Sequence, residues 1–158
     1  MIILGIDPGT AITGFGIIEK SKIKSQKLKV IDYGCIKTTT NLSTAERLDK
    51  MYKELKTLIK KYKPEIVAVE DIFFFKNLKT AIKVSQARGV ILLAIAQSKI
   101  RVAEYTPLQI KQAVACYDRA EKSQVQKMVK VLLDLKEIPK PDDAADALAV
   151  AICCAHST

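Results

Sequence analysis

The chain has 158 residues, 49% of them hydrophobic, and carries a net charge of +9 from 26 basic and 17 acidic side chains. This length and composition exclude a disordered tail and predict one domain over residues 1–158, with a core large enough to fold without disulfides or a structural metal. The positive charge favours a polyanionic partner, either nucleic acid or an anionic membrane surface, although a basic surface that serves only solubility is the alternative.

The first part of the chain predicts three strands joined by short turns. Residues 2–6 are an apolar run typical of a buried strand, and residues 7–10 (Asp-Pro-Gly-Thr) reverse the chain because proline presets the turn and glycine accepts a positive φ. Residues 13–19 form the returning strand, with glycines where another backbone can come close. Residues 27–37 form a third strand, so we expect an antiparallel meander.

A helix is predicted after the third strand. Ser43 and Glu46 have the spacing of a capping box, and apolar residues recur at helical spacing from there to about residue 62. Pro64 ends this helix, and residues 66–69 form another short buried strand.

The rest of the chain is mostly helical. Residues 78–98 predict a long helix, and residues 101–105 predict a final short strand. Residues 106–107 (Thr-Pro) begin another helix, apolar residues over 125–133 indicate a further one, and residues 142–155 form an alanine-rich last helix. This order of elements predicts an α/β fold with a mixed five-stranded sheet and helices on both faces.

Four acidic residues stand at the ends of these elements. Asp7 and Glu70 each end an apolar strand, whereas Asp143 and Asp146 lie three residues apart at the start of the last helix and therefore share a face. If the strand ends meet that helix, the four carboxylates repel one another, and divalent cations such as Mg²⁺ or Mn²⁺ would relieve the conflict. Two such ions can activate a water and stabilise the leaving oxygen of a phosphodiester.

Each acid also has an ordinary explanation. Asp7 is a common residue before a Pro-Gly turn, and Glu70 can be a charge at the end of a strand. Asp142 and Asp143 suit the positive end of a helix dipole. Asp146 lies in an alanine-rich stretch, where a buried acid needs a partner. Position alone therefore makes a metal cluster one interpretation among several.

Five motifs follow one another along most of the chain. They are Gly5-Ile6-Asp7-Pro8-Gly9-Thr10 with Thr13-Gly14-Phe15-Gly16, Val69-Glu70 with Phe73 and Lys76-Asn77, Gln86-Ala87-Arg88-Gly89-Val90, Glu121-Lys122-Ser123-Gln124-Val125-Gln126, and Asp143-Ala144-Ala145-Asp146-Ala147-Leu148-Ala149. In this order and spacing the set resembles the RuvC-type Holliday junction resolvases, which are nucleases of the ribonuclease-H-like superfamily. One motif alone can arise by chance, but five in sequence hardly can.

The resemblance implies the chemistry of the site. It implies that two Mg²⁺ ions per subunit, with Mn²⁺ as a substitute, are bound by Asp7, Glu70, Asp143 and Asp146. It also implies that Lys122, as a catalytic residue, and Lys111 approach the scissile phosphate, where an ammonium group would offset the charge that develops in the transition state. As isolated lysines, both would ordinarily be surface residues.

The resemblance also implies contacts with DNA. It implies that Phe73 stacks on a base near the centre of the junction, as an exposed aromatic side chain can do. Phe74 is the alternative, because three consecutive aromatic residues cannot all face one way. The ordinary explanation is that these aromatic side chains are buried in the core. Asn77 and Arg88 are possible DNA contacts, with helix capping or packing as their other role.

Two positions depart from the family pattern or leave a choice. Residues 116–119 (Cys-Tyr-Asp-Arg) stand where the family often has a loop with glycine, so we expect a different loop shape and an altered sequence preference. Asp142 stands beside Asp143, and either one can serve as the metal ligand.

The apolar helix at residues 78–98 bears on assembly. It is apolar on nearly all sides, so it is either buried on both sides or provides an oligomer interface. The resemblance implies a homodimer packed through this helix, whose two-fold symmetry would match that of a four-way junction. It further implies paired symmetric nicks that leave 5′-phosphate and 3′-hydroxyl ends, a role in homologous recombination and DNA repair, and the RuvA–RuvB branch-migration complex as partner.

Three other functions compete with this interpretation. One is a ribonuclease-H-like nuclease that cuts RNA–DNA hybrids, and another is a non-catalytic module that only binds junctions. The third is a sugar kinase or actin-like ATPase, which also begins with a strand and a similar turn but needs a second phosphate-binding domain, for which 158 residues are too few.

The remaining features predict a cytoplasmic protein without a membrane association. The four cysteines lack metal-binding spacing and are expected to be free thiols. The N-terminus shows no basic region of a signal peptide before Asp7, and the apolar runs are too short for a membrane span. His156, the only histidine, is expected in a frayed tail rather than in catalysis.

Overall fold

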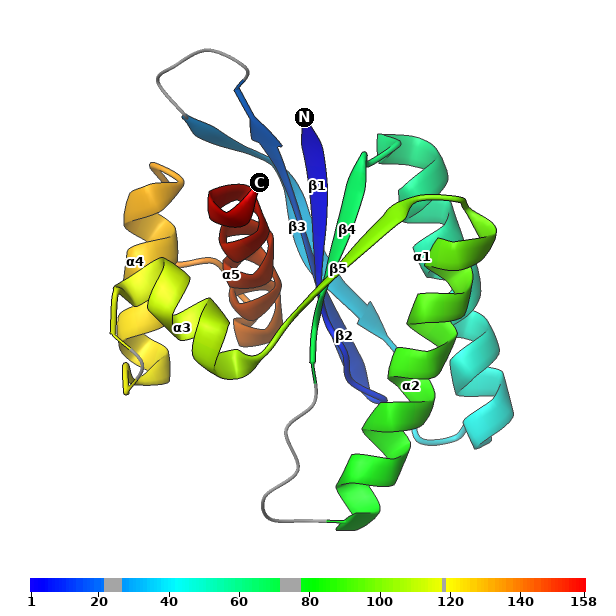
Figure 1. The fold of residues 1–158 in the computed structure, drawn as a ribbon. Helices are drawn as coiled ribbons and strands as arrows, with labels where there is room; N and C mark the ends of the chain where they lie inside the picture. The colour runs from blue at the N-terminus through cyan, green and yellow to red at the C-terminus, as the bar shows by residue number, and fades with distance from the viewer. Residues whose placement is uncertain (22–26, 72–77, 118) are drawn as a thin grey trace.

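A computed structural model describes residues 1–21, 27–71, 78–117 and 119–158 (Figure 1). The elements alternate much as the sequence predicts, beginning with three strands and ending with three helices. In chain order they are β1 (Ile2–Asp7), β2 (Ile12–Lys20), β3 (Leu28–Lys37), α1 (Thr44–Tyr62), β4 (Ile66–Glu70), α2 (Leu78–Gln97), β5 (Arg101–Tyr105), α3 (Pro107–Ala115), α4 (Lys122–Leu132) and α5 (Asp142–Ser157).

The strands form one sheet in the order β3-β2-β1-β4-β5. The first three strands pair antiparallel as the predicted meander, whereas β1 pairs parallel with β4, and β4 pairs parallel with β5. The prediction of a mixed five-stranded sheet is therefore confirmed. The parallel pairing matters for function, because it brings the carboxyl ends of β1 and β4 to the same edge of the sheet.

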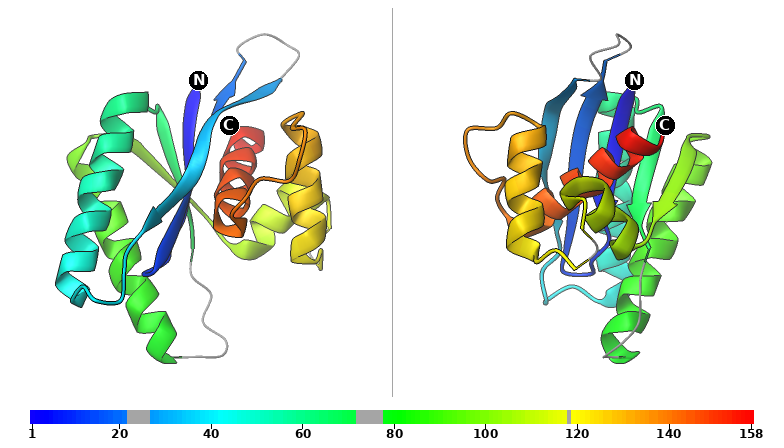
Figure 2. Two further views of the ribbon diagram at one scale, coloured as in Figure 1. Left: turned by 180° about the vertical axis from the view of Figure 1, so that it is seen from behind. Right: turned by 60° about the vertical axis from the view of Figure 1, so that its left-hand side comes forward.

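Helices cover both faces of the sheet. α1 and α2 lie on one face, and α3, α4 and α5 lie on the other (Figures 1 and 2). Alternate residues of a strand point to opposite faces, so Leu4 and Val67 pack with α1 and α2. Their neighbours Ile3 and Ala68 pack against the α5 side. Each central strand is thus buried on both faces, as its unbroken apolar sequence predicts.

The last helix lies unusually close to the sheet because of glycines in β1 and β2. A Cβ atom added at Gly14 would lie 2.0 Å from the carbonyl oxygen of Asp143, and one added at Gly5 would lie 2.2 Å from that of Ala147. Only glycine permits this approach of main chain to main chain. The prediction that the glycines of residues 13–19 let another backbone come close is confirmed at Gly14. This close contact places the start of α5 directly on β2.

Local signals define the ends of two helices. The Ser43 hydroxyl accepts a hydrogen bond from the Glu46 amide, and the Glu46 carboxylate accepts one from the Ser43 amide at 2.7 Å, which completes the predicted capping box of α1. Thr106 caps α3 in the same way with Gln109 as its partner. Lys63 ends α1 in a left-handed conformation, directly before Pro64.

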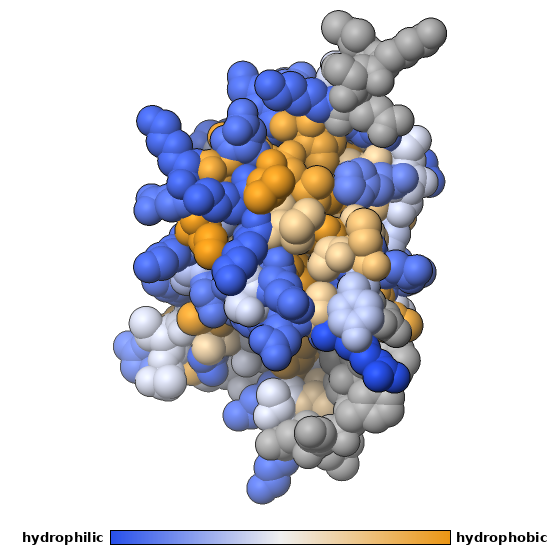
Figure 3. Space-filling model, turned by 90° about the vertical axis from the view of Figure 1, so that its left-hand side faces the viewer, coloured by the Kyte–Doolittle hydropathy of each residue, from blue (hydrophilic) through white to orange (hydrophobic). Residues whose placement is uncertain are grey.

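Exposed hydrophobic side chains occur on the helices of both faces of the sheet. On the face of α3 and α4, hydrophilic groups surround hydrophobic ones (Figure 3), and Leu108 and Val131 are exposed. On α2, Ile82 and Leu93 are exposed. Within the described ranges, none of the helices combines the length and apolarity that a membrane crossing requires.

Candidate active site

Asp7 and Glu70 end two neighbouring parallel strands. Ile6 of β1 pairs with Val69 of β4, so the residues that follow them emerge side by side at one edge of the sheet. Their carboxyl groups are close enough to share a hydrogen bond. Two acids that the sequence places 63 positions apart therefore form one pair.

The pair is held in an unfavourable electrostatic environment. Burial, followed by the negative charge of Glu70, raises the pKa of Asp7 to about 8, and Asp146 and Asp143 add to this effect. Burial also raises the pKa of Glu70, although its hydrogen bond with Asp7 opposes the shift. At neutral pH without a cation, Asp7 is therefore protonated, because burial and the neighbouring negative charges disfavour its ionised form.

The other two predicted acids lie at the start of α5. Asp146 is half-buried, and its carboxylate oxygen Oδ2 lies 2.7 Å from Nζ of Lys122 on α4. Lys122 also lies 3.8 Å from Asp142, which is exposed. Burial raises the pKa of Asp146, and the hydrogen bond and charge of Lys122 oppose that shift. The lysine thus partly neutralises the acids of α5.

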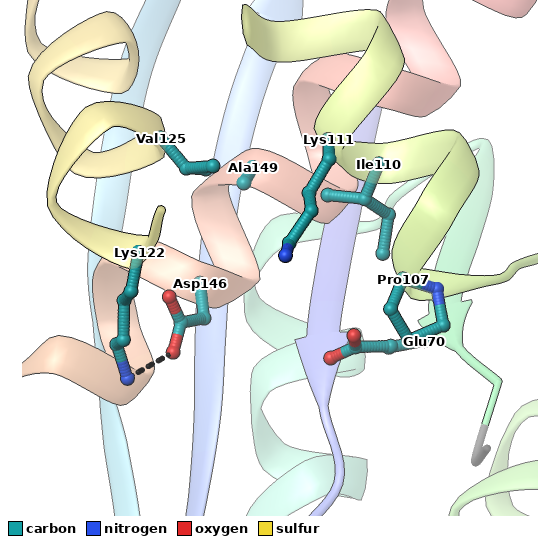
Figure 4. A pocket seen from close by; sticks show the side chains of 8 residues that line it. All are labelled: Glu70, Pro107, Ile110, Lys111, Lys122, Val125, Asp146 and Ala149. Atoms are coloured by element: carbon teal, nitrogen blue, oxygen red, sulfur yellow. Dashed lines mark ion pairs between the residues drawn. The ribbon is translucent and has the colours of Figure 1, made fainter. Parts of the chain in front are cut away.

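A cavity of about 190 Å³ lies between these elements (Figure 4). Figure 4 shows the carboxylate of Glu70 and the ammonium group of Lys111 directed into the space between Glu70 and Asp146. Two acids and two lysines therefore line one hollow, and the ammonium group of Lys122 is turned to Asp146. Its lining consists of Glu70, Pro107, Ile110, Lys111, Lys122, Val125, Asp146 and Ala149.

The donor set suits a hard divalent cation. All four predicted ligands offer carboxylate oxygens, which Mg²⁺ and Mn²⁺ prefer. The pKa of Asp7 is raised first by burial and then by the charges of Glu70, Asp146 and Asp143, and a bound cation would offset both effects. With the side chains as they stand, no three acidic, histidine or cysteine side chains of the described residues lie close enough to hold one ion. Loading the site would therefore require Asp7 to lose its proton and Asp146 to leave Lys122.

The turn that carries Asp7 is anchored on the α1 side of the sheet. The Thr13 hydroxyl donates to the Gly9 carbonyl at 2.6 Å and contacts the sulfur of Met51 at 3.3 Å. The Thr38 hydroxyl donates to the carbonyl of Thr10 at 2.6 Å. These bonds anchor the turn at Gly9 and Thr10, directly after the strand that ends at Asp7.

The predicted DNA contacts have different outcomes. Phe73, Phe74 and Asn77 lie outside the described residues. Arg88 forms ion pairs with Asp71 at 3.1 Å and with Glu104. Its contact with DNA stays a prediction, as do the catalytic roles of Lys111 and Lys122.

Sequence reasoning did not identify two residues near the site. Thr38 anchors the turn, but its place in a run of three threonines after a strand carries no signal of this role. Cys35 on β3 lies near Asp143 and Asp7; burial, followed by the charge of Asp143, raises its pKa. Only the pairing of β3 with β2 opposite Gly14 brings this thiol to the site.

Known proteins match the chain over nearly its whole length. The family model described as crossover junction endodeoxyribonuclease RuvC matches residues 3–154. The crossover junction endodeoxyribonuclease RuvC of Halothermothrix orenii is 57% identical over 157 residues, covering 99% of this chain and 93% of the relative.

Solved structures agree with the sequence match. The Thermus thermophilus RuvC structure superposes with a TM-score of 0.91 at 34% identity, covering 99% of this chain and 95% of the other. T. thermophilus RuvC in complex with Holliday junction substrate gives a TM-score of 0.89 at 32% identity with the same coverage. The chain therefore belongs to the RuvC family of crossover junction endodeoxyribonucleases, and its sheet and flanking helices are the ribonuclease-H-like fold of that family.

Proposed function

We propose that the chain resolves four-way DNA junctions by cutting two strands symmetrically through hydrolysis of phosphodiester bonds. The observation that carries the proposal is the gathering of Asp7, Glu70, Asp146, Lys111 and Lys122 around one edge of the sheet in a member of the RuvC family. The solved complex of a relative with a Holliday junction substrate supports the choice of substrate.

Two Mg²⁺ ions, or Mn²⁺ in their place, would be held by Asp7, Glu70, Asp143 and Asp146. Bound there, the ions would supply an activated water and neutralise charge on the leaving oxygen. The chain contributes the arrangement of the acids. Glu70 and Asp7 are placed by the parallel pairing of β1 and β4, and the acids of α5 are placed by its contact with Gly14.

The two lysines would act on the phosphate itself. Lys111 is directed into the cavity beside Glu70, and Lys122 is close to Asp146 (Figure 4). An ammonium group at either place can stabilise negative charge on the phosphate as the bond to the leaving oxygen breaks. In the absence of DNA, Lys122 compensates Asp146, and on binding it would exchange that carboxylate for a phosphate oxygen.

The proposal includes a homodimer through α2. The buried side of this helix carries Ala87, Ile91 and Ala94. The opposite side is exposed and carries a stripe of Ile82, Gly89, Leu93 and Ala96 among polar residues, with Ile82 54% and Leu93 52% accessible. An exposed apolar stripe on one helix supports self-association, and a two-fold axis there would present two equivalent sites to a junction. The RuvA–RuvB branch-migration complex is the expected partner from family resemblance.

The test is a cleavage assay on three substrates. Purified protein with Mg²⁺ is incubated with a labelled four-way junction, a plain duplex and an RNA–DNA hybrid. We expect paired symmetric nicks on the junction alone, and we expect EDTA to abolish them. Preferred cutting of the hybrid would instead indicate a ribonuclease.

Two variants complete the test. Asp7→Asn and Asp146→Asn should abolish cleavage while junction binding survives, because each removes a carboxylate ligand but no DNA contact. Asp49→Asn is the matched control, since this exposed acid on α1 pairs only with Lys53 in the described structure. Retained cleavage in Asp7→Asn would refute the four-carboxylate site, and junction binding without any cleavage by the unaltered chain would favour a non-catalytic module.

A further inference from the structure

A second, smaller cavity lies on the other face of the sheet from the acidic site. Its volume is about 40 Å³, and it opens between the starts of α1 and α2 and the turn after β1. The acidic cavity, by contrast, is lined by α3, α4 and α5. The lining of the smaller cavity consists of Thr10, Thr44, Arg47, Leu48, Met51 and Lys83.

Two positively charged side chains line this hollow. Arg47 and Lys83 make no ion pair with any of the described residues. Other lysines of α1 do: Lys53 pairs with Asp49 at 2.6 Å, and Lys50 pairs with Glu54. Within the described part of the chain, the charges of Arg47 and Lys83 are therefore not compensated, which favours an anion in the hollow.

Arg47 is pre-organised. It is half-buried, and its Nε donates a hydrogen bond to the Thr38 hydroxyl at 2.9 Å. Nε is thereby occupied, and the planar guanidinium keeps its two NH₂ groups for a ligand. An arginine held in this way loses little side-chain entropy when it binds a phosphate.

The same threonine connects the cavity to the catalytic turn. The Thr38 hydroxyl that accepts from Arg47 also donates to the carbonyl of Thr10, three residues after Asp7. Met51, which also lines the cavity, contacts the Thr13 hydroxyl near the start of β2. The cavity therefore has a fixed place relative to Asp7, on the opposite side of the turn from the acidic cavity.

We infer that this cavity binds a phosphodiester of the junction other than the scissile one. The inference rests on the proposed function, because it needs DNA at Asp7. A cavity of this size accepts about three water-sized groups at roughly 10–15 Å³ each, which is enough for the two free oxygens of a phosphodiester. The hydroxyls of Thr10 and Thr44 and the positive end of α1 add further donors and a favourable dipole. DNA would then be held on both sides of the turn that presents Asp7.

The experiment combines variants with DNA in which one phosphate at a time is a neutral methylphosphonate. Junction affinity is measured without a divalent metal, so that nothing is cut, for the unaltered chain and for Arg47→Gln and Lys83→Gln. Lys60→Gln is the control, since it removes the same charge from an exposed place in the last turn of α1.

We expect one methylphosphonate near the cleavage site to weaken binding by the unaltered chain about tenfold, the usual loss for a hydrogen bond to a charged group. The two variants should bind the ordinary junction about tenfold more weakly and lose nothing further with that methylphosphonate. The slope of log affinity against log salt should fall by about 0.7–0.9 in each variant, and Lys60→Gln should behave as the unaltered chain does.

Two results would overturn the inference. One is unchanged affinity in both variants. The other is a loss of affinity in which every methylphosphonate effect persists, because this would mean a general effect of charge. If the unaltered chain neither binds nor cuts junctions, the proposed function fails instead, so the two failures are distinguishable.

Discussion

Lys122 on α4 lies 2.7 Å from the carboxylate of Asp146 on α5, so the lysine expected at the scissile phosphate is paired with an acid expected to bind metal. The two roles compete, because an ammonium group that compensates Asp146 occupies the place of a cation. We expect Lys122→Gln to slow single-turnover cleavage by about 10²- to 10³-fold, as the loss of one group that stabilises transition-state charge does. The metal concentration for half-maximal rate should not rise.

The control for this variant lies on the same helix. Lys127→Gln removes an exposed positive charge from α4 and should cleave at the normal rate. Equal slowing in both variants would mean that the cleavage rate depends on the total charge of α4 and not on the position of Lys122.

The stability of the metal-free chain should depend on pH through Asp7. Its pKa is raised from 3.8 to about 8, chiefly by burial, so folding favours the protonated carboxyl group. This contribution is complete below pH 3.8 and is lost as the pH rises towards 8. In EDTA, Asp7→Asn should therefore raise the Tm by at least about 3 °C more at pH 8 than at pH 5, because most of the contribution is lost between those two pH values.

Calorimetry at both pH values checks this expectation. Asp49→Asn, at an exposed position, should shift the Tm equally at pH 5 and pH 8. A lower Tm of Asp7→Asn at pH 8 would show that the ionised carboxylate stabilises the fold, contrary to the electrostatics of the site.

A methyl group at Gly14 should damage the site more than the sheet. Its Cβ would lie 2.0 Å from the carbonyl oxygen of Asp143, so the start of α5 must move. We expect Gly14→Ala to destabilise the chain by about 1–3 kcal/mol, as overpacking does, and to abolish cleavage while the chain stays folded. Gly34→Ala meets only the ring of Phe15, at 3.0 Å, and should retain activity. Normal cleavage by Gly14→Ala would separate catalysis from the position of α5.

A charge on the exposed stripe of α2 should separate the proposed dimer. Leu93→Glu and Ile82→Glu place a carboxylate on side chains that are 52% and 54% exposed in the single chain, and they should give monomers in sedimentation experiments. Junctions should then be nicked in one strand at a time. Val131→Glu, on the exposed surface of α4, should leave the assembly unchanged, and a dimer that survives both α2 variants would place the interface elsewhere.

Base stacking should distinguish Phe73 from Phe74. The fluorescence of 2-aminopurine at the junction centre changes when an aromatic side chain stacks on it. We expect Phe73→Ala to lose that change and Phe74→Ala to keep it. The reverse result would assign stacking to Phe74, and loss in neither variant would refute stacking by this segment.

Local sequence patterns predicted the elements well, because their causes are local. The capping residues Ser43 and Thr106 bond within their own first turns, and the short apolar runs of β1 and β4 are typical of strands buried on both faces. The three-strand meander followed from short turns, and the order of the other strands follows from general rules of connection. The positions of the acids at element ends were therefore predictable.

What joins those acids is not local. The pairing of Asp7 with Glu70 depends on β1 and β4 being neighbours, and the pairing of Lys122 with Asp146 depends on how α4 packs on α5. Arg88 illustrates the limit: its motif resembles that of the family, but the carboxylates of Asp71, after β4, and Glu104, on β5, pair with its guanidinium group. Periodicity and capping cannot reveal such long-range partners, and family resemblance supplied the roles instead.

The contact of α5 with the sheet is main chain against main chain at Gly5 and Gly14, with no side chains between them to act as a cushion. At these two positions the distance between the strands and the helix, which carry the acids, is therefore set by the backbone and not by the size of core side chains. A cation of larger radius would have to be accommodated by carboxylate rotation alone, since Ca²⁺ needs longer bonds and more ligands than Mg²⁺. The backbone contact would then determine which ion size the site accepts, and most substitutions of core side chains would leave this preference unchanged.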